Sequence, residues 1–310
     1  MKRFLTNILY FFIISTISYF GLVVISGKLL RSDFRPNLPD DINSSNLLRR
    51  KLSEIENYKN VDILFLGSSH AYRGFDVRLF KKNNFTSFNL GSSSQTPIQT
   101  ELILSTYLDE ISPKLVVFEV YPAVFCADGA ESGIDFILND LKSFKSARLI
   151  NNLKIYNLFI YNFFKKHIEN DNSKKNNIIS NPNYIKGGFL ERKNAYFKYS
   201  SYKDSKWKFK PYQIQAFKDI LDFLEKNEQP YILVQAPITR SFYNSHTNNE
   251  TFDSIMSERS KYVNFNKLIK LNDSLHFYDN NHLNQKGVEL FNTELIKVMK
   301  KDMSLTKLFN

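Results

Sequence analysis

The sequence predicts an α/β fold around a parallel sheet, and three observations support this prediction. Short apolar runs alternate with helix-like segments between about residues 61 and 301, as in βαβ units. Polar residues follow several of these runs, at the carboxyl edge where open α/β sheets bind ligands. The chain has 310 residues, of which 43% are hydrophobic and 15% aromatic. That is enough apolar material for one large packed domain.

The chain begins with an apolar segment that is long enough to cross a membrane. Between Arg3 and Lys28 lie 24 uncharged residues. A helix of this length, at about 1.5 Å per residue, spans the roughly 30 Å hydrocarbon layer. The segment is longer than the apolar region of a cleaved signal peptide, which is about 7 to 15 residues. We therefore predict a membrane anchor over residues 1–30, with the N-terminus inside and the rest of the chain extracytoplasmic.

The elements that follow are predicted from periodicity and from the residues that end each run. Residues 31–60 are predicted to form a stalk, helical from about 42 to 58, because Leu47, Leu48, Leu52 and Ile55 recur at helical spacing. Residues 61–310 are predicted to form the domain. Its expected strands are 61–67, 87–91, 114–121, 231–236 and 275–278, and its expected helices are 97–108, 212–226, 252–261 and 286–301.

The stretch from about 123 to 210 interrupts this alternation. It is rich in Tyr, Phe, Asn and Lys, contains the single Trp207, and has no clear strand signal. We predict a largely helical insertion. Its aromatic residues at 156, 159, 161, 163 and 164 are expected to pack on the core, with an acyl pocket or a membrane-docking face as the alternatives.

Charge and cysteine content exclude several classes of function. The formal net charge is +11, which suits a solvated basic face or attraction to anionic envelope polymers and lipid headgroups. Nucleic acid is not an expected partner of an extracytoplasmic domain. The single Cys126 excludes an intramolecular disulfide and is expected to be a small buried residue. Neither a glycine-rich phosphate loop nor a metal-binding motif is visible, so no cofactor and no metal are expected.

Two segments carry groups suited to nucleophilic catalysis. Ser69 follows the first predicted strand in Gly67-Ser68-Ser69, and Asp279-x-x-His282 precedes the last predicted helix. A serine hydroxyl needs a histidine to accept its proton, and that histidine benefits from a carboxylate that fixes its tautomer. Backbone N–H groups at strand ends can stabilise an oxyanion, and those of Ser69 and Gly91 are so placed.

Alternatives remain for each role. Ser68 is a rival nucleophile, because the register of the turn is not fixed by the sequence. His70 and His276 are rival bases, although His276 falls within the predicted strand 275–278. Taken singly, the serine could cap a helix and the aspartate could form a turn. Arg73 and Asp76 are expected to form an ion pair that supports the loop.

Three segments resemble sequence blocks of the SGNH (GDSL-like) hydrolase superfamily. They are Gly67-Ser68-Ser69 (first block), Gly91 at the end of the second predicted strand (second block) and Asp279-x-x-His282 (fifth block). The resemblance implies a three-layer α/β/α fold with a flavodoxin-like parallel sheet. It also implies Ser69 as nucleophile, His282 as base, Asp279 orienting it, and Gly91 as an oxyanion donor. Two features depart from the pattern: Ser68 stands where an Asp is usual, and the third strand ends in Glu119-Val120-Tyr121 without the usual Asn. Gly67-Ser68-Ser69, and Pro122 after the third strand, are more like the membrane-anchored branch that includes the teichoic-acid D-alanyl transfer protein and polysaccharide O-acetylation proteins.

The expected function is a membrane-anchored extracytoplasmic serine esterase or O-acyltransferase. Its expected substrate is an acylated glycan or another ester, with an acyl group such as acetyl on a cell-envelope polysaccharide. A membrane-bound acyltransferase is an expected partner. The alternative is a non-catalytic scaffold of a surface-polymer modification complex. Hydrolysis and transfer differ only in whether water or a sugar hydroxyl accepts the acyl group, and the sequence does not decide between them.

Overall fold

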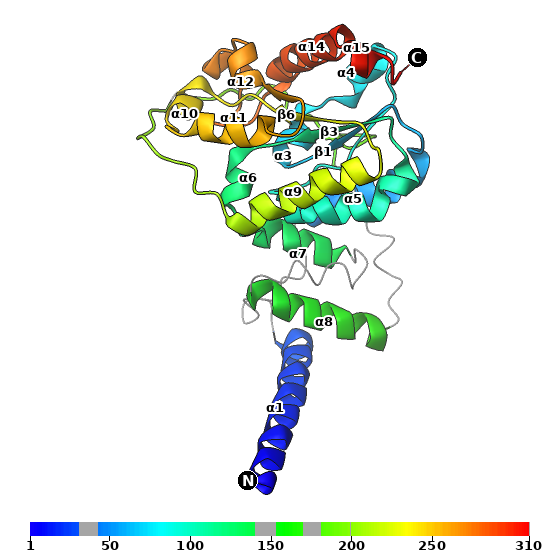
Figure 1. Cartoon of the computed structure of the whole chain (residues 1–310), viewed down its shortest axis with the longest axis vertical. Helices are drawn as coiled ribbons and strands as arrows, with labels where there is room; N and C mark the ends of the chain where they lie inside the picture. Colours follow the sequence, from blue (N-terminus) through cyan, green and yellow to red (C-terminus); the bar gives the residue numbers. More distant parts are fainter. Residues whose placement is uncertain (31–42, 140–152, 170–180, 199, 310) are drawn as a thin grey trace.

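The computed structural model describes residues 1–30, 43–139, 153–169, 181–198 and 200–309. A parallel five-stranded sheet forms the centre, with strand order β2-β1-β3-β6-β7 (Figure 1). The strands are β1 (Ile63–Leu66), β2 (Ser87–Asn89), β3 (Leu115–Glu119), β6 (Tyr231–Gln235) and β7 (Tyr262–Asn264). Every neighbouring pair is parallel. The predicted α/β fold with a parallel sheet is confirmed.

Helices cover both faces of the sheet and make three layers. On one face, Leu64 and Leu66 of β1 pack in a cluster with α5 (Pro97–Ile111) and α9 (Pro211–Lys226). On the other face, Ile63 and Phe65 pack with α4 (Val77–Lys82) and α14 (Gln285–Lys301). Successive side chains of a strand point to opposite faces, so a run that is apolar at every position fits a strand covered on both sides. Further helices are α3 (Ser69–Gly74), α10 (Arg240–Asn244), α11 (Asn249–Ser257), α12 (Phe265–Leu268), α13 (Asp273–His276) and α15 (Met303–Thr306).

The fifth strand lies elsewhere than the sequence predicts. Residues 262–264 form β7, whereas the predicted strand at 275–278 is wrong. The chain there makes the short helix α13, because the Asn272 side chain accepts hydrogen bonds from the N–H groups of Ser274 and Leu275. Phe277 then makes only an isolated antiparallel bridge to Leu283.

The predicted stalk and insertion are described only in part. Stalk residues 31–42 lie outside the described residues, and the remainder forms α2 (Asn43–Glu54) and a 3₁₀ turn (Ile55–Asn57). The described part of the insertion is mainly helical, with α6 (Pro122–Cys126), α7 (Ala130–Leu138) and α8 (Leu153–Glu169). Residues 140–152, 170–180 and 199 fall outside the description. The insertion also contains an unpredicted antiparallel hairpin of β4 (Tyr184–Ile185) and β5 (Phe189–Leu190), which turns at two glycines of positive φ.

The N-terminal helix α1 (Lys2–Leu29) projects away from the α/β layers (Figure 1). It is long and apolar enough to cross a membrane, and most of its side chains are exposed. Helix α8 packs against its last turns, where the Tyr161 hydroxyl donates a hydrogen bond to the Gly27 carbonyl at 3.2 Å. Four aromatic residues of α8 therefore belong to a separate cluster with α1 and α7, whereas Phe163 is exposed. The prediction that these residues pack on the core of the α/β domain is therefore wrong.

Candidate active site

The turn after β1 places Ser68 and Ser69 in different environments. Gly67 has φ +132°, and a Cβ there would lie 2.7 Å from the Glu119 carbonyl oxygen, so the position requires glycine. Ser68 is the N-cap of α3, where its Oγ accepts a hydrogen bond from the His70 N–H. Its side chain is therefore held inside the protein. Ser69 is the first helical residue and is only partly buried.

The structure brings Ser69, His282 and Asp279 into one hydrogen-bonded series. Ser69 Oγ lies 2.7 Å from His282 Nε2. His282 Nδ1 lies 2.8 Å and 3.1 Å from the two carboxylate oxygens of Asp279. Asp279 Oδ1 also accepts the N–H groups of Asn281 and His282. Burial raises the pKa of Asp279, but the hydrogen bonds from His282 and these N–H groups outweigh it, so its pKa lies below the usual range. The carboxylate that orients His282 is therefore ionised at neutral pH.

The two rival bases lie in other settings. The ring of His276 accepts a hydrogen bond from the Asn272 N–H at Nδ1, within the turn around α13. His70 packs between the rings of Tyr121 and His282, with centroid distances of 3.9 Å and 4.8 Å. Burial, and then the charge of His282, holds the pKa of His70 well below its ordinary value. The His70 Nδ1 atom lies 3.2 Å from Ser68 Oγ, so this ring contacts the cap and not Ser69.

The two predicted oxyanion donors differ in their availability. As the first residue of α3, Ser69 has an N–H without a helical acceptor four residues back. The Gly91 N–H donates to Asn89 Oδ1 at 3.1 Å, so a side chain occupies it. Gly91 does lie against the turn after β1, because a Cβ there would be 3.0 Å from the Ser68 carbonyl oxygen. Its own carbonyl accepts a hydrogen bond from the buried Lys51 at 2.5 Å.

Glu119 is a buried acid that the sequence reasoning noted only for standing where an Asn is usual. Its Oε2 accepts hydrogen bonds from the N–H and the Oγ of Ser68, at 3.2 Å and 3.0 Å. Its Oε1 is buried without a hydrogen-bond partner among the described residues. Burial raises the pKa of Glu119 to about 8, although the bonds from Ser68 oppose this. Glu119 is therefore mainly a neutral carboxylic acid at pH 7, and it holds the residue that precedes Ser69. The sequence carries one sign of this buried acid, because Glu119 is a charged residue at the end of an otherwise apolar strand.

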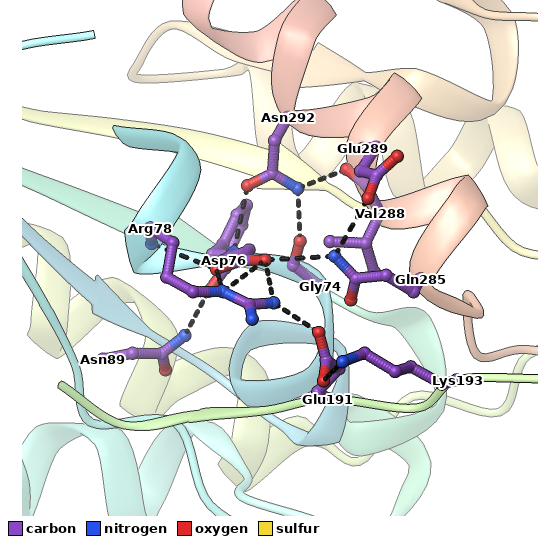
Figure 2. Close-up of polar contacts among 11 residues, drawn as sticks. Gly74, Asp76, Arg78, Asn89, Glu191, Lys193, Gln285, Val288, Glu289 and Asn292 are labelled. Carbon is purple, nitrogen blue, oxygen red and sulfur yellow. Dashed lines mark hydrogen bonds and ion pairs between the residues drawn. The ribbon is translucent and has the colours of Figure 1, made fainter. Parts of the chain in front are cut away.

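The predicted ion pair between Arg73 and Asp76 is wrong. Asp76 caps α4 and pairs with Arg78, whose Nη2 lies 2.7 Å from Asp76 Oδ2 (Figure 2). Arg78 also contacts Glu191 at 2.6 Å, and Glu191 pairs with Lys193 at 2.8 Å. A capping carboxylate points toward the helix that it starts, which places Arg78, and not Arg73, within its reach.

Cys126 lies at the end of α6 and is only partly buried. Burial raises the pKa of its thiol, which does not favour a nucleophilic thiolate. Across the described ranges, no group of three His, Cys, Asp or Glu side chains is placed to hold a metal ion.

Comparisons with known proteins find similarity only at the level of solved structures. No protein-family model and no curated protein matches the sequence. The chain is similar to a structure described as a "putative acylhydrolase" from Bacteroides fragilis NCTC 9343, at 12% identity and a TM-score of 0.42, covering 84% of this chain and 99% of that one. It is also similar to a GDSL-like lipase from Bacteroides thetaiotaomicron VPI-5482, at 13% identity and a TM-score of 0.38, covering 82% and 98%.

Proposed function

We propose that this chain is an SGNH-type serine enzyme that cleaves or transfers an O-acyl group. The observation that carries the proposal is the series of hydrogen bonds from Ser69 Oγ through His282 to Asp279. A serine becomes a useful nucleophile when a histidine accepts its proton and a carboxylate holds the histidine tautomer. Both conditions are met by side chains from opposite ends of the chain, which the fold brings together at the carboxyl edge of the sheet.

In the proposed reaction, Ser69 Oγ attacks the carbonyl carbon of an ester while its proton passes to His282 Nε2. The bond to the alcohol then breaks, and the alcohol leaves with that proton. The acyl group remains on Ser69 until water or a sugar hydroxyl takes it, with His282 accepting the proton of the attacking group. The Ser69 N–H is available to stabilise the oxyanion, and one such donor is worth on the order of 100-fold to 1000-fold in rate.

We infer that α1 anchors the enzyme in a membrane, with the catalytic domain on the extracytoplasmic side. The apolar surface of α1 supports anchoring. The inferred substrate is an acylated cell-envelope polysaccharide, and a membrane-bound acyltransferase is the inferred partner if the acyl group is transferred instead of hydrolysed.

Hydrolysis of p-nitrophenyl acetate by the full-length protein in detergent tests the proposal. Ser69→Ala is expected to reduce turnover to the background rate, because the nucleophile is lost. The matched control is Ser254→Ala, which changes an exposed serine on α11. Wild-type turnover in Ser69→Ala would overturn the proposal.

A non-catalytic scaffold is the second candidate function, and one observation favours it. The Gly91 N–H, which the resemblance implies as an oxyanion donor, is already bonded to Asn89. The Asn that usually supplies another donor after the third strand is absent from this sequence. A scaffold predicts that folded wild-type protein has no esterase activity and that a partner is recovered by crosslinking. Ester turnover that depends on His282 would exclude this candidate.

A further inference from the structure

The guanidinium groups of two arginines lie close to an aromatic ring, and this ring stacks on the imidazole of the candidate base. The ring of Tyr278 is stacked on His282, with centroids 5.5 Å apart and an interplanar angle of 6°. The guanidinium carbon of Arg192 lies 5.3 Å from the Tyr278 ring centroid, and that of Arg73 lies 5.8 Å from it. Arg73 stands four residues after Ser69 on α3, so both side chains leave the same face of that helix.

Neither arginine forms an ion pair within the part of the chain that the structure describes. Among the described residues, the Arg73 side chain donates one hydrogen bond, from Nε to the Tyr72 hydroxyl at 3.3 Å. Arg192 is exposed, and its described contact is with the Tyr278 ring. Contacts of this kind with an aromatic face leave the N–H donors along the guanidinium edge available.

The carboxylates near these arginines form ion pairs or hydrogen bonds with other groups. Asp76 and Glu191 both contact Arg78, and Glu191 also pairs with Lys193 (Figure 2). The Asp279 carboxylate attracts the charge of Arg73, but its oxygens accept from the His282 ring and from two backbone N–H groups. The two guanidinium groups therefore present positive charge and open donors beside the candidate catalytic residues.

We propose that Arg73 and Arg192 form a subsite for an anionic group of the substrate, a carboxylate or a phosphate carried close to the ester. This inference rests on the proposed function and specifies its substrate as an acidic polymer. A planar guanidinium can bind either a carboxylate or a phosphate through two parallel hydrogen bonds. The property that these two anions share is their negative charge. The Tyr278 ring contacts both guanidinium groups and stacks on His282, so the subsite lies one aromatic ring away from the candidate base.

Inhibition of p-nitrophenyl acetate hydrolysis tests the subsite with the full-length protein in detergent. The probes are an oligogalacturonate for carboxylate, glycerol phosphate for phosphate, and a cello-oligosaccharide of equal length as the neutral control. At least one acidic probe is expected to compete with the ester, and its inhibition is expected to weaken with added salt. Which acidic probe competes distinguishes the two anion sources.

The variants separate this subsite from general attraction to a basic protein. Arg192→Gln is expected to raise the inhibition constant of the acidic probe about tenfold, because one charge-assisted contact is lost. Arg73→Gln is expected to act in the same direction, and Arg192→Lys is expected to restore part of the loss. The matched control is Lys218→Gln, which removes an equal charge from the exposed surface of α9 and should leave the inhibition constant unchanged.

Equal inhibition by acidic and neutral probes would overturn the subsite, and so would equal effects of Arg192→Gln and Lys218→Gln. Labelling by a fluorophosphonate distinguishes this failure from failure of the proposed function. If Ser69 is labelled in every variant but inhibition shows no charge preference, the subsite is wrong and the serine chemistry stands. If Ser69 is never labelled, the proposed function fails, and direct calorimetric titration of the acidic probe then decides the subsite, with wild-type binding that Arg192→Gln loses as the supporting result.

Discussion

Replacing Glu119 by Gln should remove the pH dependence that the buried Glu119 carboxyl group gives to the free energy of unfolding. Glu119 is 1% exposed, and burial raises its pKa from 4.5 to about 8. A carboxyl group whose pKa is raised by folding stabilises the fold fully below pH 4.5. That contribution decreases as the pH rises toward 8, because the unfolded chain ionises first. At about 1.4 kcal/mol per pKa unit, the full effect is at most about 5 kcal/mol, and roughly 3 to 4 kcal/mol of it falls between pH 5 and 8.

Gln keeps the shape of the neutral acid and cannot ionise, so Glu119→Gln should lose this dependence. Its carbonyl oxygen can still accept from the Ser68 N–H, and its amide nitrogen replaces an oxygen that has no described hydrogen-bond partner. The assay is urea unfolding of full-length protein in detergent, followed by Trp207 fluorescence from pH 5 to 9. Wild type should lose stability relative to the variant as the pH rises, whereas the exposed control Glu250→Gln should run parallel to wild type. A constant difference between wild type and Glu119→Gln across this range would refute the reasoning.

Two further predictions concern the candidate base and the packing of the anchor. Asp279→Asn should lower kcat for an aryl ester by roughly 1,000-fold to 10,000-fold with an unchanged melting temperature, because the His282 tautomer is no longer fixed; a change of less than tenfold would contradict this role. Gly27→Val should separate α8 from α1 and speed tryptic cleavage within α8, since a Cβ at Gly27 would overlap the Tyr161 ring. Gly21→Val is its control, because no atom of the described residues outside its own helix turn lies within 4 Å of a Cβ there, and equal cleavage of both variants would count against the packing.

Much of the fold could be predicted from the sequence because the central strands β1, β3 and β6 are mostly apolar and the helices have clear ends. The strand that became β1 and the helix that became α14 were found within about three residues. The error at 275–278 came from an apolar pair, Leu275 and Phe277, that resembles a strand locally. The fold instead uses Asn272 to start a short helix, and no pattern of hydrophobicity reports such a cap.

The residues that the sequence predicts for the site lie together in the structure, whereas their surroundings could not be predicted. The two serines differ in what their hydroxyls contact: that of Ser68 caps α3 and faces Glu119, and that of Ser69 faces His282. The raised pKa of Glu119 depends on three-dimensional burial, which residue order does not reveal. The contact of Arg192 with Tyr278 joins segments 86 positions apart in the printed sequence, so only the folded chain brings it to the site.

Peptide mapping after fluorophosphonate labelling tests the central claim most directly. Full-length folded protein is expected to carry one adduct, on Ser69, and the adduct should disappear in His282→Ala because the hydroxyl then lacks its base. Labelling should persist in Ser254→Ala. An adduct on Ser68, or no adduct on folded wild-type protein, would contradict the assignment of Ser69 as the nucleophile.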